Sequence, residues 1–134
     1  MRQAAVIAAR LSVADTLADA LAGVDYVQEN APERLELKRE LYAELDRLAP
    51  PSAILASSTS SIPASAFAGH VPGRGRCLVA HPVNPPYLVP VVELCGAPWT
   101  DAGIIARAAE ILRAVGQKPA IVRKIGRASC RERV

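Results

Sequence analysis

One histidine of this sequence lies in a setting that suits acid–base chemistry. His81 opens the run HPVNPP, and Glu93 follows twelve residues later. An imidazole has an ordinary pKa of about 6.5, so it can take up and release a proton near neutral pH. A carboxylate partner fixes the tautomer of such a ring and stabilises its charged form. If the prolines turn the chain back, Glu93 lies beside His81 and the pair suits general base catalysis. The alternative is a structural histidine.

Further polar residues follow three stretches that are expected to be strands. Glu29 and Asn30 follow the first stretch, the run SSTSS at 57–61 follows the second, and His81 and Asn84 follow the third. In open α/β sheets, chemistry gathers at the carboxyl ends of the strands. The sequence therefore predicts that three strand ends converge on one crevice.

Two kinds of pattern predict the elements that position these residues. Short runs rich in β-forming or apolar residues predict strands at 24–28, 53–56, 77–80, 89–94 and 118–122. Because Pro90 cannot donate to a ladder, the strand at 89–94 should lie at a sheet edge or begin at a bulge.

Helical spacing predicts three helices between these strands. One follows Ser12, which has capping-box spacing to Asp15, and stops at Gly23. The second has Pro32 at its first position and carries leucines at 37, 41, 45 and 48. The third is capped by Thr100, turns residues 104, 108, 111, 112 and 115 inward and stops at Gly116. Helices that alternate with continuous apolar strands indicate an α/β fold with a parallel sheet buried on both faces.

Composition excludes several classes of protein. The chain has 134 residues, which is the length of one domain, and 51% of them are hydrophobic. The net charge of +3 is concentrated at the C-terminus and aromatic residues make up 4%, so we expect no nucleic-acid partner. No apolar run is long enough to span a membrane, and no signal peptide is expected. The three cysteines have no metal-ligand spacing, so we expect no metal and a reduced, cytoplasmic location.

The last ten residues differ from the rest of the chain. The run IGRASCRERV at 125–134 resembles the translation of a common sequencing adaptor. We therefore expect a domain over residues 1–124 and an artefactual tail over 125–134. The alternative is an ordinary basic C-terminal tail.

Three stretches resemble a known family. They read DYVQENAPERLELK at 25–38, ILASSTSS at 54–61 and VAHPVNPPYLVPVVEL at 79–94. In this order and spacing they are similar to the NAD-binding domain of the L-3-hydroxyacyl-CoA dehydrogenases. The HPVNPP run is most similar to the branch that includes lambda-crystallin (L-gulonate 3-dehydrogenase) and the carnitine dehydrogenases. The resemblance covers about residues 10 to 124. It implies NAD as the cofactor and oxidation of a secondary 3-hydroxyl to a ketone.

The resemblance also assigns roles to residues. His81 matches the family's catalytic histidine, which takes the proton of the substrate hydroxyl, and Glu93 matches the glutamate paired with it. Ser60 matches a serine that contacts both substrate and cofactor, although it could also be an ordinary loop serine.

Three further residues match positions that contact the cofactor. Asn84 matches an asparagine on the nicotinamide side, and Glu33 and Lys38 match two other cofactor contacts. Glu33 could instead favour a helix N-terminus, and Lys38 could be a solvated charge on a helix.

Parts of the family's pattern do not occur in this sequence. It holds no G-x-G-x-x-G turn, which places the pyrophosphate at a helix N-terminus. The helical C-terminal domain, which completes the substrate site and forms the dimer contact in the family, has no counterpart either. We therefore expect a truncated internal fragment, the C-terminal half of a doubly wound Rossmann-type domain, which is inactive by itself. The strand at 24–28 should then expose a sheet edge.

The resemblance leaves the substrate open among CoA thioesters, carnitine and sugar acids. In the complete protein it implies a small-molecule substrate and a homodimer. Two other functions remain possible at this stage. One is a non-catalytic, crystallin-like protein on the same fold, and the other is a nucleotide- or CoA-binding module of unrelated origin.

Overall fold

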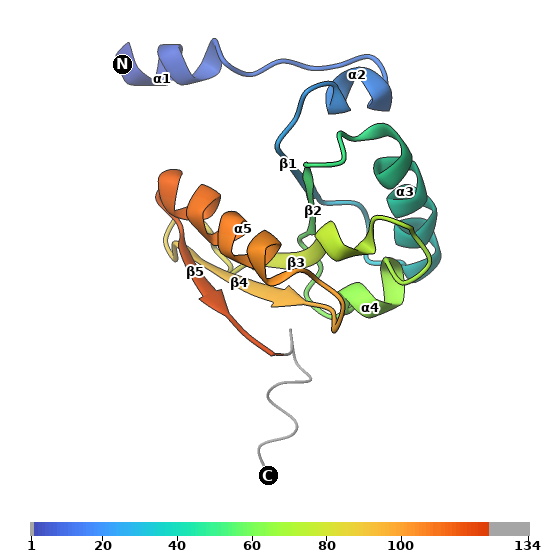
Figure 1. The fold of residues 1–134 in the computed structure, drawn as a ribbon. Helices are drawn as coiled ribbons and strands as arrows, with labels where there is room; N and C mark the ends of the chain where they lie inside the picture. Colours follow the sequence, from blue (N-terminus) through green and yellow to red (C-terminus); the bar gives the residue numbers. More distant parts are fainter. Residues whose placement is uncertain (1, 124–134) are drawn as a thin grey trace.

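A single mixed sheet forms the centre of the molecule. The computed structural model describes residues 2–123, so the expected tail at 125–134 lies outside the described residues. Within them the chain runs α1 (Arg2–Ala8), α2 (Leu17–Leu21), β1 (Tyr26–Glu29), α3 (Leu35–Leu48), β2 (Ile54–Ser57), α4 (Ala64–Phe67), η1 (Arg74–Arg76), β3 (Cys77–Pro82), β4 (Val91–Gly96), α5 (Ala102–Ala114) and β5 (Lys118–Ile121). The strands lie side by side in the order β1-β2-β3-β4-β5 (Figure 1).

The prediction of an all-parallel sheet is wrong for two of the strands. β1, β2 and β3 are parallel, but β4 is antiparallel to β3, and β5 is parallel to β4. The reason is the connection between β3 and β4, which spans only residues 83–90. A parallel crossover needs about a dozen residues or more, so this connection can only form a hairpin. β1 lies at an edge of the described sheet, as expected, whereas β4 lies between β3 and β5. Pro90 accordingly falls just before β4 rather than in an edge strand.

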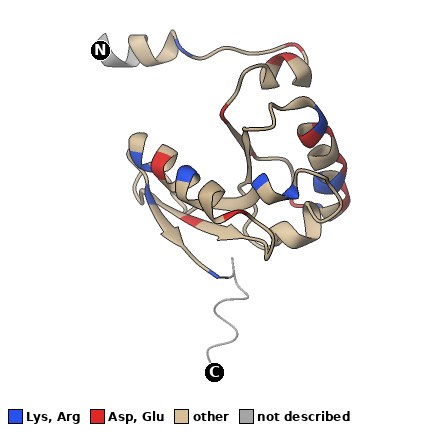
Figure 2. Cartoon of the chain, in the orientation of Figure 1, with Lys and Arg blue, Asp and Glu red and all other residues tan. Residues whose placement is uncertain are grey.

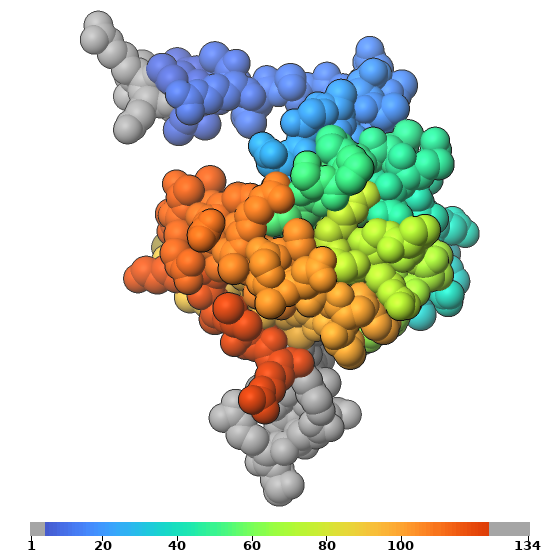
Figure 3. Space-filling model, in the orientation of Figure 1, coloured from blue at the N-terminus to red at the C-terminus, as the bar shows by residue number. Residues whose placement is uncertain are grey.

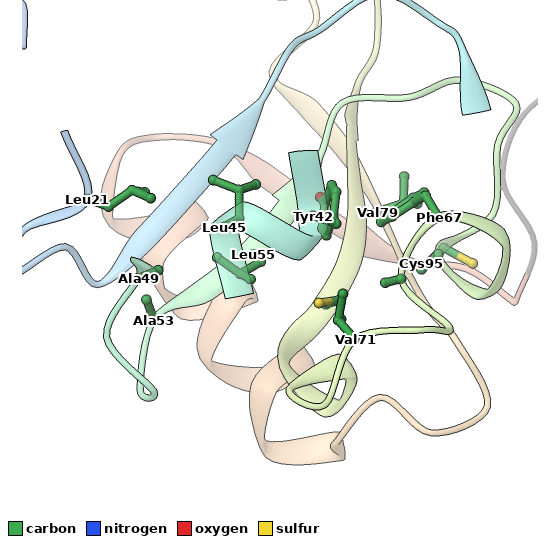
Figure 4. Packing of buried hydrophobic residues seen from close by; sticks show 13 residues of the cluster. Leu21, Tyr42, Leu45, Ala49, Ala53, Leu55, Phe67, Val71, Val79 and Cys95 are labelled. Carbon is green, nitrogen blue, oxygen red and sulfur yellow. The ribbon is translucent and has the colours of Figure 1, made fainter. Parts of the chain in front are cut away.

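Helices cover both faces of the sheet, which confirms the α/β class (Figure 1). On one face, Tyr42 and Leu45 of α3 and Phe67 of α4 pack against Leu55 and Val79 (Figure 4). The Tyr42 and Phe67 rings lie 4.4 Å apart between centroids. On the other face, α5 packs Ala108, Ala109 and Leu112 against alternate residues of β2, β3 and β4. Successive side chains of each strand thus point alternately to the α3 face and to the α5 face of the sheet. This alternation determines which side chains lie on the α3 face at the carboxyl ends of the strands.

The buried face of α3 is shifted from the predicted one. Lys38, Tyr42 and Leu45 are the buried residues, while Leu41 and Leu48 pack only partly against the core. The opposite side carries both acidic and basic residues (Figure 2). α5 shows a similar difference, because Val115 is exposed rather than inward.

Several helix ends differ from the expected ones. α2 is capped by Thr16, whose hydroxyl accepts a hydrogen bond from the Asp19 amide, rather than by Ser12. α3 begins at Leu35 instead of Pro32. Thr100 does not cap α5, because its hydroxyl donates to the Cys77 carbonyl. The expected stops at Gly23 and Gly116 are confirmed, and both glycines have positive φ angles that other residues rarely adopt.

The N-terminal segment was not predicted to be helical. α1 stands clear of the sheet and its helices at the end of an extended stretch (Figures 1 and 3). The side chains of residues 5–16 are exposed. Among the described residues no helix combines the length and apolar character that a membrane crossing requires.

The amino end of the sheet provides a test of the packing. Asp46 of α3 pairs with Arg76 at 2.9 Å and accepts a hydrogen bond from the Gly73 amide. A Cβ atom at Gly73 would overlap the Asp46 carboxylate, whereas one at Gly103 meets open space.

Gly73→Ala should therefore destabilise the fold by about 1–3 kcal/mol in urea unfolding. Gly103→Ala, the control, should be neutral or stabilising by up to about 1 kcal/mol. Equal effects of the two changes would contradict this packing.

Candidate active site

The hairpin of β3 and β4 brings His81 and Glu93 together. The two residues are directly opposite in the register of the hairpin. Their side chains therefore project from the same face of the sheet. Nδ1 of His81 lies 3.2 Å from Oε2 of Glu93, within hydrogen-bond distance. The predicted pairing is thus confirmed in its geometry.

The position of Glu93 within its strand differs from the expectation. We expected Ser60, His81, Asn84 and Glu93 to converge at the carboxyl ends of adjacent strands, but Glu93 lies in the first half of β4. Because β4 is antiparallel to β3, the start of β4 lies beside the end of β3. The hairpin therefore delivers the carboxylate to the same edge of the sheet.

The pairing fixes the tautomer of His81. A carboxylate can only accept a hydrogen bond, so Nδ1 must carry the proton and donate it to Glu93. The other ring nitrogen, Nε2, then presents a lone pair in the neutral imidazole. The side chains of His81 and Glu93 are 19% and 32% exposed, so the pair is shielded but not sealed from solvent.

A pocket of about 290 Å³ lies at the carboxyl ends of the parallel strands. It is lined by Asn30, Ser58, His81, Pro82, Asn84 and Pro86. Asn30 follows β1, Ser58 follows β2, and the remaining residues end β3 or begin its loop. The predicted convergence of three strand ends is therefore confirmed. Asn84, one of the expected cofactor contacts, is at this pocket.

Ser60 is not among the lining residues. It is exposed in the loop after β2, and Ser58 reaches the pocket instead. Ser58 is fixed there because its amide and its hydroxyl both donate to the Glu29 carbonyl, each at 2.9 Å. The side-chain amide of Asn30 donates to the Gln28 carbonyl at 3.0 Å. The residues directly after β1 and β2 thus form one wall of the pocket. The sequence could have indicated Ser58 rather than Ser60 as a pocket residue, because Ser58 is the one that directly follows the strand.

Glu33 binds the loop after β2 rather than a helix N-terminus. Its carboxylate accepts hydrogen bonds from the hydroxyls of Thr59 and Ser61 and from the Ser61 amide. Partial burial alone would raise the pKa of Glu33, but these hydrogen bonds and the Lys38 ammonium 3.9 Å away outweigh it, so the pKa is lowered. The Glu33 side chain is 41% exposed at this edge, which leaves it able to accept a hydrogen bond from a ligand.

Lys38 lies in the interior, so its interpretation as a solvated charge is wrong. Its side chain is 1% exposed, and its ammonium lies 2.9 Å from both carboxylate oxygens of Glu29. Ser57 donates a hydrogen bond of 2.6 Å to the same carboxylate. Sequence reasoning missed this cluster, because the leucine spacing of α3 placed Lys38 beside the predicted core rather than within it.

Other candidate sites are less developed in the described residues. A cavity of about 450 Å³ at the amino end of the sheet contains Asp46 and Arg76, but these side chains already bind each other. Cys77 and Cys95 are buried free thiols, and burial raises the pKa of Cys77 to about 12. No group of three or more potential metal ligands occurs within residues 2–123.

Comparison with known proteins identifies a matching family and several relatives. Residues 1–125 match the family "3-hydroxyacyl-CoA dehydrogenase, NAD binding domain". An L-carnitine dehydrogenase of Streptomyces coelicolor is 44% identical over 108 residues, which cover 81% of this chain and 34% of that protein. A lambda-crystallin homolog of Bos taurus is 48% identical over 112 residues, again covering 81% of this chain and 34% of the relative. The chain thus spans about a third of the length of these relatives.

A solved structure supports the same relationship. The 3-hydroxybutyryl-CoA dehydrogenase of Escherichia coli superimposes with a TM-score of 0.76 and 32% identity. The match covers 81% of this chain and 23% of that one. The expected Rossmann-type fold is confirmed by this likeness.

The contacts of Glu33 predict how its carboxyl group titrates. A group with a lowered pKa stabilises the fold above its ordinary pKa of 4.5, and this contribution is lost as the pH falls through the lowered value. Ser61→Ala and Thr59→Val each remove a hydroxyl donor, so each should raise the pKa of Glu33 in an NMR titration. Ser60→Ala is the control. It removes a hydroxyl from the same loop, but this hydroxyl does not bind Glu33, so the pKa of Glu33 should be unchanged. An unaltered pKa in the Thr59 variant would overturn the assignment.

Proposed function

Because the chain belongs to the 3-hydroxyacyl-CoA dehydrogenase family through its NAD-binding domain, we propose that the protein oxidises a secondary 3-hydroxyl group to a ketone with NAD. The observation that carries this proposal is the His81–Glu93 pair beside a polar pocket. Relatives named L-carnitine dehydrogenase and the structural neighbour named 3-hydroxybutyryl-CoA dehydrogenase are oxidoreductases, which supports this reaction class.

The described residues fit one end of the cofactor. The pocket lies at the carboxyl ends of parallel strands, where open α/β sheets bind such ligands. Its volume of about 290 Å³ suits the nicotinamide and the reacting carbon rather than a whole dinucleotide. Asn84 and Ser58 offer polar groups to the nicotinamide side, and Glu33 suits a hydroxyl donor of the cofactor. When bound, NAD⁺ supplies the acceptor for the hydride that leaves carbon 3.

The roles of His81 and Glu93 follow from their geometry. Nδ1 of His81 is held by Glu93, so Nε2 is the nitrogen that accepts the proton of the substrate hydroxyl. As the ring becomes charged, the Glu93 carboxylate stabilises it. Glu93 therefore orients the ring before the transfer and balances its charge afterwards. Ser60, exposed on the loop next to the pocket wall, is proposed to contact the substrate.

The relatives suggest which substrates to test first. Three relatives named L-carnitine dehydrogenase, including the Streptomyces coelicolor protein, are 43–46% identical to this chain. L-carnitine is a 3-hydroxy acid, so it heads a panel that also contains 3-hydroxyacyl-CoA thioesters and 3-hydroxy sugar acids.

A non-catalytic role is the second candidate. It is favoured by the likeness to proteins named lambda-crystallin, one of which is 42% identical over 117 residues. Absence of NADH formation with every member of the panel, in a complete protein that binds NAD, would favour this role over catalysis.

Substitution of the paired residues tests the proposed mechanism. In the complete protein, His81→Ala should lower kcat by about 10²- to 10⁴-fold, the usual contribution of a general base. NAD affinity should survive, because the ring acts on the substrate proton. Glu93→Gln should cost less, since it keeps a hydrogen-bond acceptor and removes only the charge.

The matched control is His70→Ala. His70 is exposed, and its ring contacts the Arg39 carbonyl away from the pocket. NADH formation should be unchanged in this variant. Wild-type turnover in the His81→Ala protein would rule out the catalytic assignment.

The 134-residue chain by itself should show no dehydrogenase activity. It corresponds to about a third of its relatives, and its sequence holds no glycine-rich turn for the cofactor pyrophosphate. Correct positioning contributes on the order of 7–11 kcal/mol to such reactions, and a partial site cannot supply it. NADH formation by the purified chain above its own His81→Ala variant would disprove this prediction.

A further inference from the structure

The side chain of Gln28 reaches across the sheet on the face that α5 covers. Gln28 lies in β1 and pairs in register with Ala56 of β2. Its Nε2 atom nevertheless donates a hydrogen bond of 3.0 Å to the Ala80 carbonyl, which belongs to β3. The side chain therefore ties β1 directly to the second strand along the sheet. The residues at 56 and 80 are both alanines buried on this face, and their small side chains leave room for this contact.

Tyr26 fixes the orientation of this amide group. A carbonyl oxygen can only accept a hydrogen bond, so the NH₂ group of Gln28 must face Ala80. The Oε1 atom of Gln28 then accepts a hydrogen bond of 2.8 Å from the Tyr26 hydroxyl. Burial raises the pKa of Tyr26, so the hydroxyl keeps the proton that it donates. Both ends of the Gln28 amide are therefore paired, and the hydrogen bonds run in sequence from Tyr26 through Gln28 to Ala80.

The Ala80 carbonyl lies where β3 extends beyond β2. β2 ends at Ser57, and the last register pair between these two strands is Ser57 with Val79. Two residues further on, the Thr59 amide would be the next to face β3, but it binds the Ser57 hydroxyl at 3.3 Å. The Gln28 amide therefore supplies a donor at the point where the ladder between β2 and β3 stops.

The peptide group that Gln28 holds leads directly to the proposed base. The Ala80 carbonyl and the His81 amide belong to one planar peptide unit, so a donor on the carbonyl also restrains the start of His81. On its other side β3 pairs with β4, and this hairpin carries Glu93 together with His81. The hairpin fixes these two side chains relative to each other. Gln28 joins the same end of the hairpin to β1, which leads into the pocket wall.

We propose that Gln28 is a positioning residue for the reaction: its amide holds the Ala80–His81 peptide against β1 and so sets the place of the His81 ring relative to the pocket wall that follows β1 and β2. Gln28 is not among the residues that line the pocket, so it acts through His81 rather than on a ligand. Tyr26 has the secondary role of orienting the amide. This inference rests on the proposed function, since it concerns the proton transfer assigned to His81.

The test replaces the amide, in the complete protein, by an apolar side chain of similar length. In Gln28→Met the Ala80 carbonyl loses its donor, so kcat should fall about tenfold, because small displacements of a reacting group have effects of this order. The dissociation constant of NADH, measured by fluorescence, should keep its wild-type value, because Gln28 lies outside the pocket. The pH profile of kcat should keep its shape, since the His81–Glu93 pair stays intact within the hairpin.

Thr100→Val is the matched control. The Thr100 hydroxyl donates a hydrogen bond of 2.8 Å to the Cys77 carbonyl, at the opposite end of β3. Each variant removes a side-chain donor from a β3 carbonyl, so both should lower Tm in calorimetry. Only Gln28→Met should lower kcat at a temperature at which both proteins are folded. Wild-type kcat per NADH-binding molecule in Gln28→Met would overturn the proposal and leave Gln28 a structural role. A joint loss of kcat and NADH affinity would also overturn it, since Gln28 would then act on the cofactor.

Two further measurements keep the outcome decisive. If Gln28→Met does not fold, Tyr26→Phe removes only the hydroxyl that orients the amide, and kcat should fall about threefold. Wild-type kcat in this variant would contradict the proposal. If the complete wild-type protein oxidises no member of the panel, the proposed function fails, and NMR then tests the positioning by itself. The signals of the Ala80 carbonyl and of the His81 ring should shift in Gln28→Met but not in the control, and an unchanged His81 ring would refute the role of Gln28.

Discussion

The short connection between β3 and β4 is the constraint on which the rest of the site depends. With only residues 83–90 available, the chain must reverse, and β4 must pair antiparallel with β3. The resulting register places Glu93 opposite His81 and on the same face of the sheet. It also makes β4 an interior strand, which then carries β5 beside it and α5 on the far face. A crossover helix at this point would have moved the carboxylate to the other end of the sheet.

α3 is attached to the sheet by two ion pairs of opposite polarity. Lys38, near its start, binds Glu29 at the carboxyl edge, and Asp46, near its end, binds Arg76 at the amino edge. Each charge has the sign that the helix dipole disfavours at that end. Specific partners, Glu29 in β1 and Arg76 in η1, therefore outweigh the dipole and fix both ends of the helix. Only the pair at the carboxyl edge is linked to the pocket wall.

The family relationship and the geometry of the site give different information about this protein. Membership in the 3-hydroxyacyl-CoA dehydrogenase family establishes NAD as the cofactor and the fold of the domain. The local geometry adds which side chains reach the pocket, since it places Ser58 rather than Ser60 there and turns Lys38 inward. A likeness of sequence motifs identifies equivalent positions, but it does not show which of their atoms face a ligand.

The sequence by itself determined the α/β class, the positions of the five strands to within two residues, and the order in which these strands alternate with α2, α3 and α5, but it did not predict α1 or α4. These features follow from local patterns, because apolar runs, leucine spacing and glycine stops act over a few residues. It also identified the His81–Glu93 pair, since the prolines that reverse the chain lie between them. Only the tertiary structure decided that β4 runs antiparallel and that the buried face of α3 is centred on Tyr42 and includes Lys38. Both depend on which surfaces pack together, and the burial of Lys38 depends on a carboxylate nine residues earlier whose presence beside it no local pattern encodes.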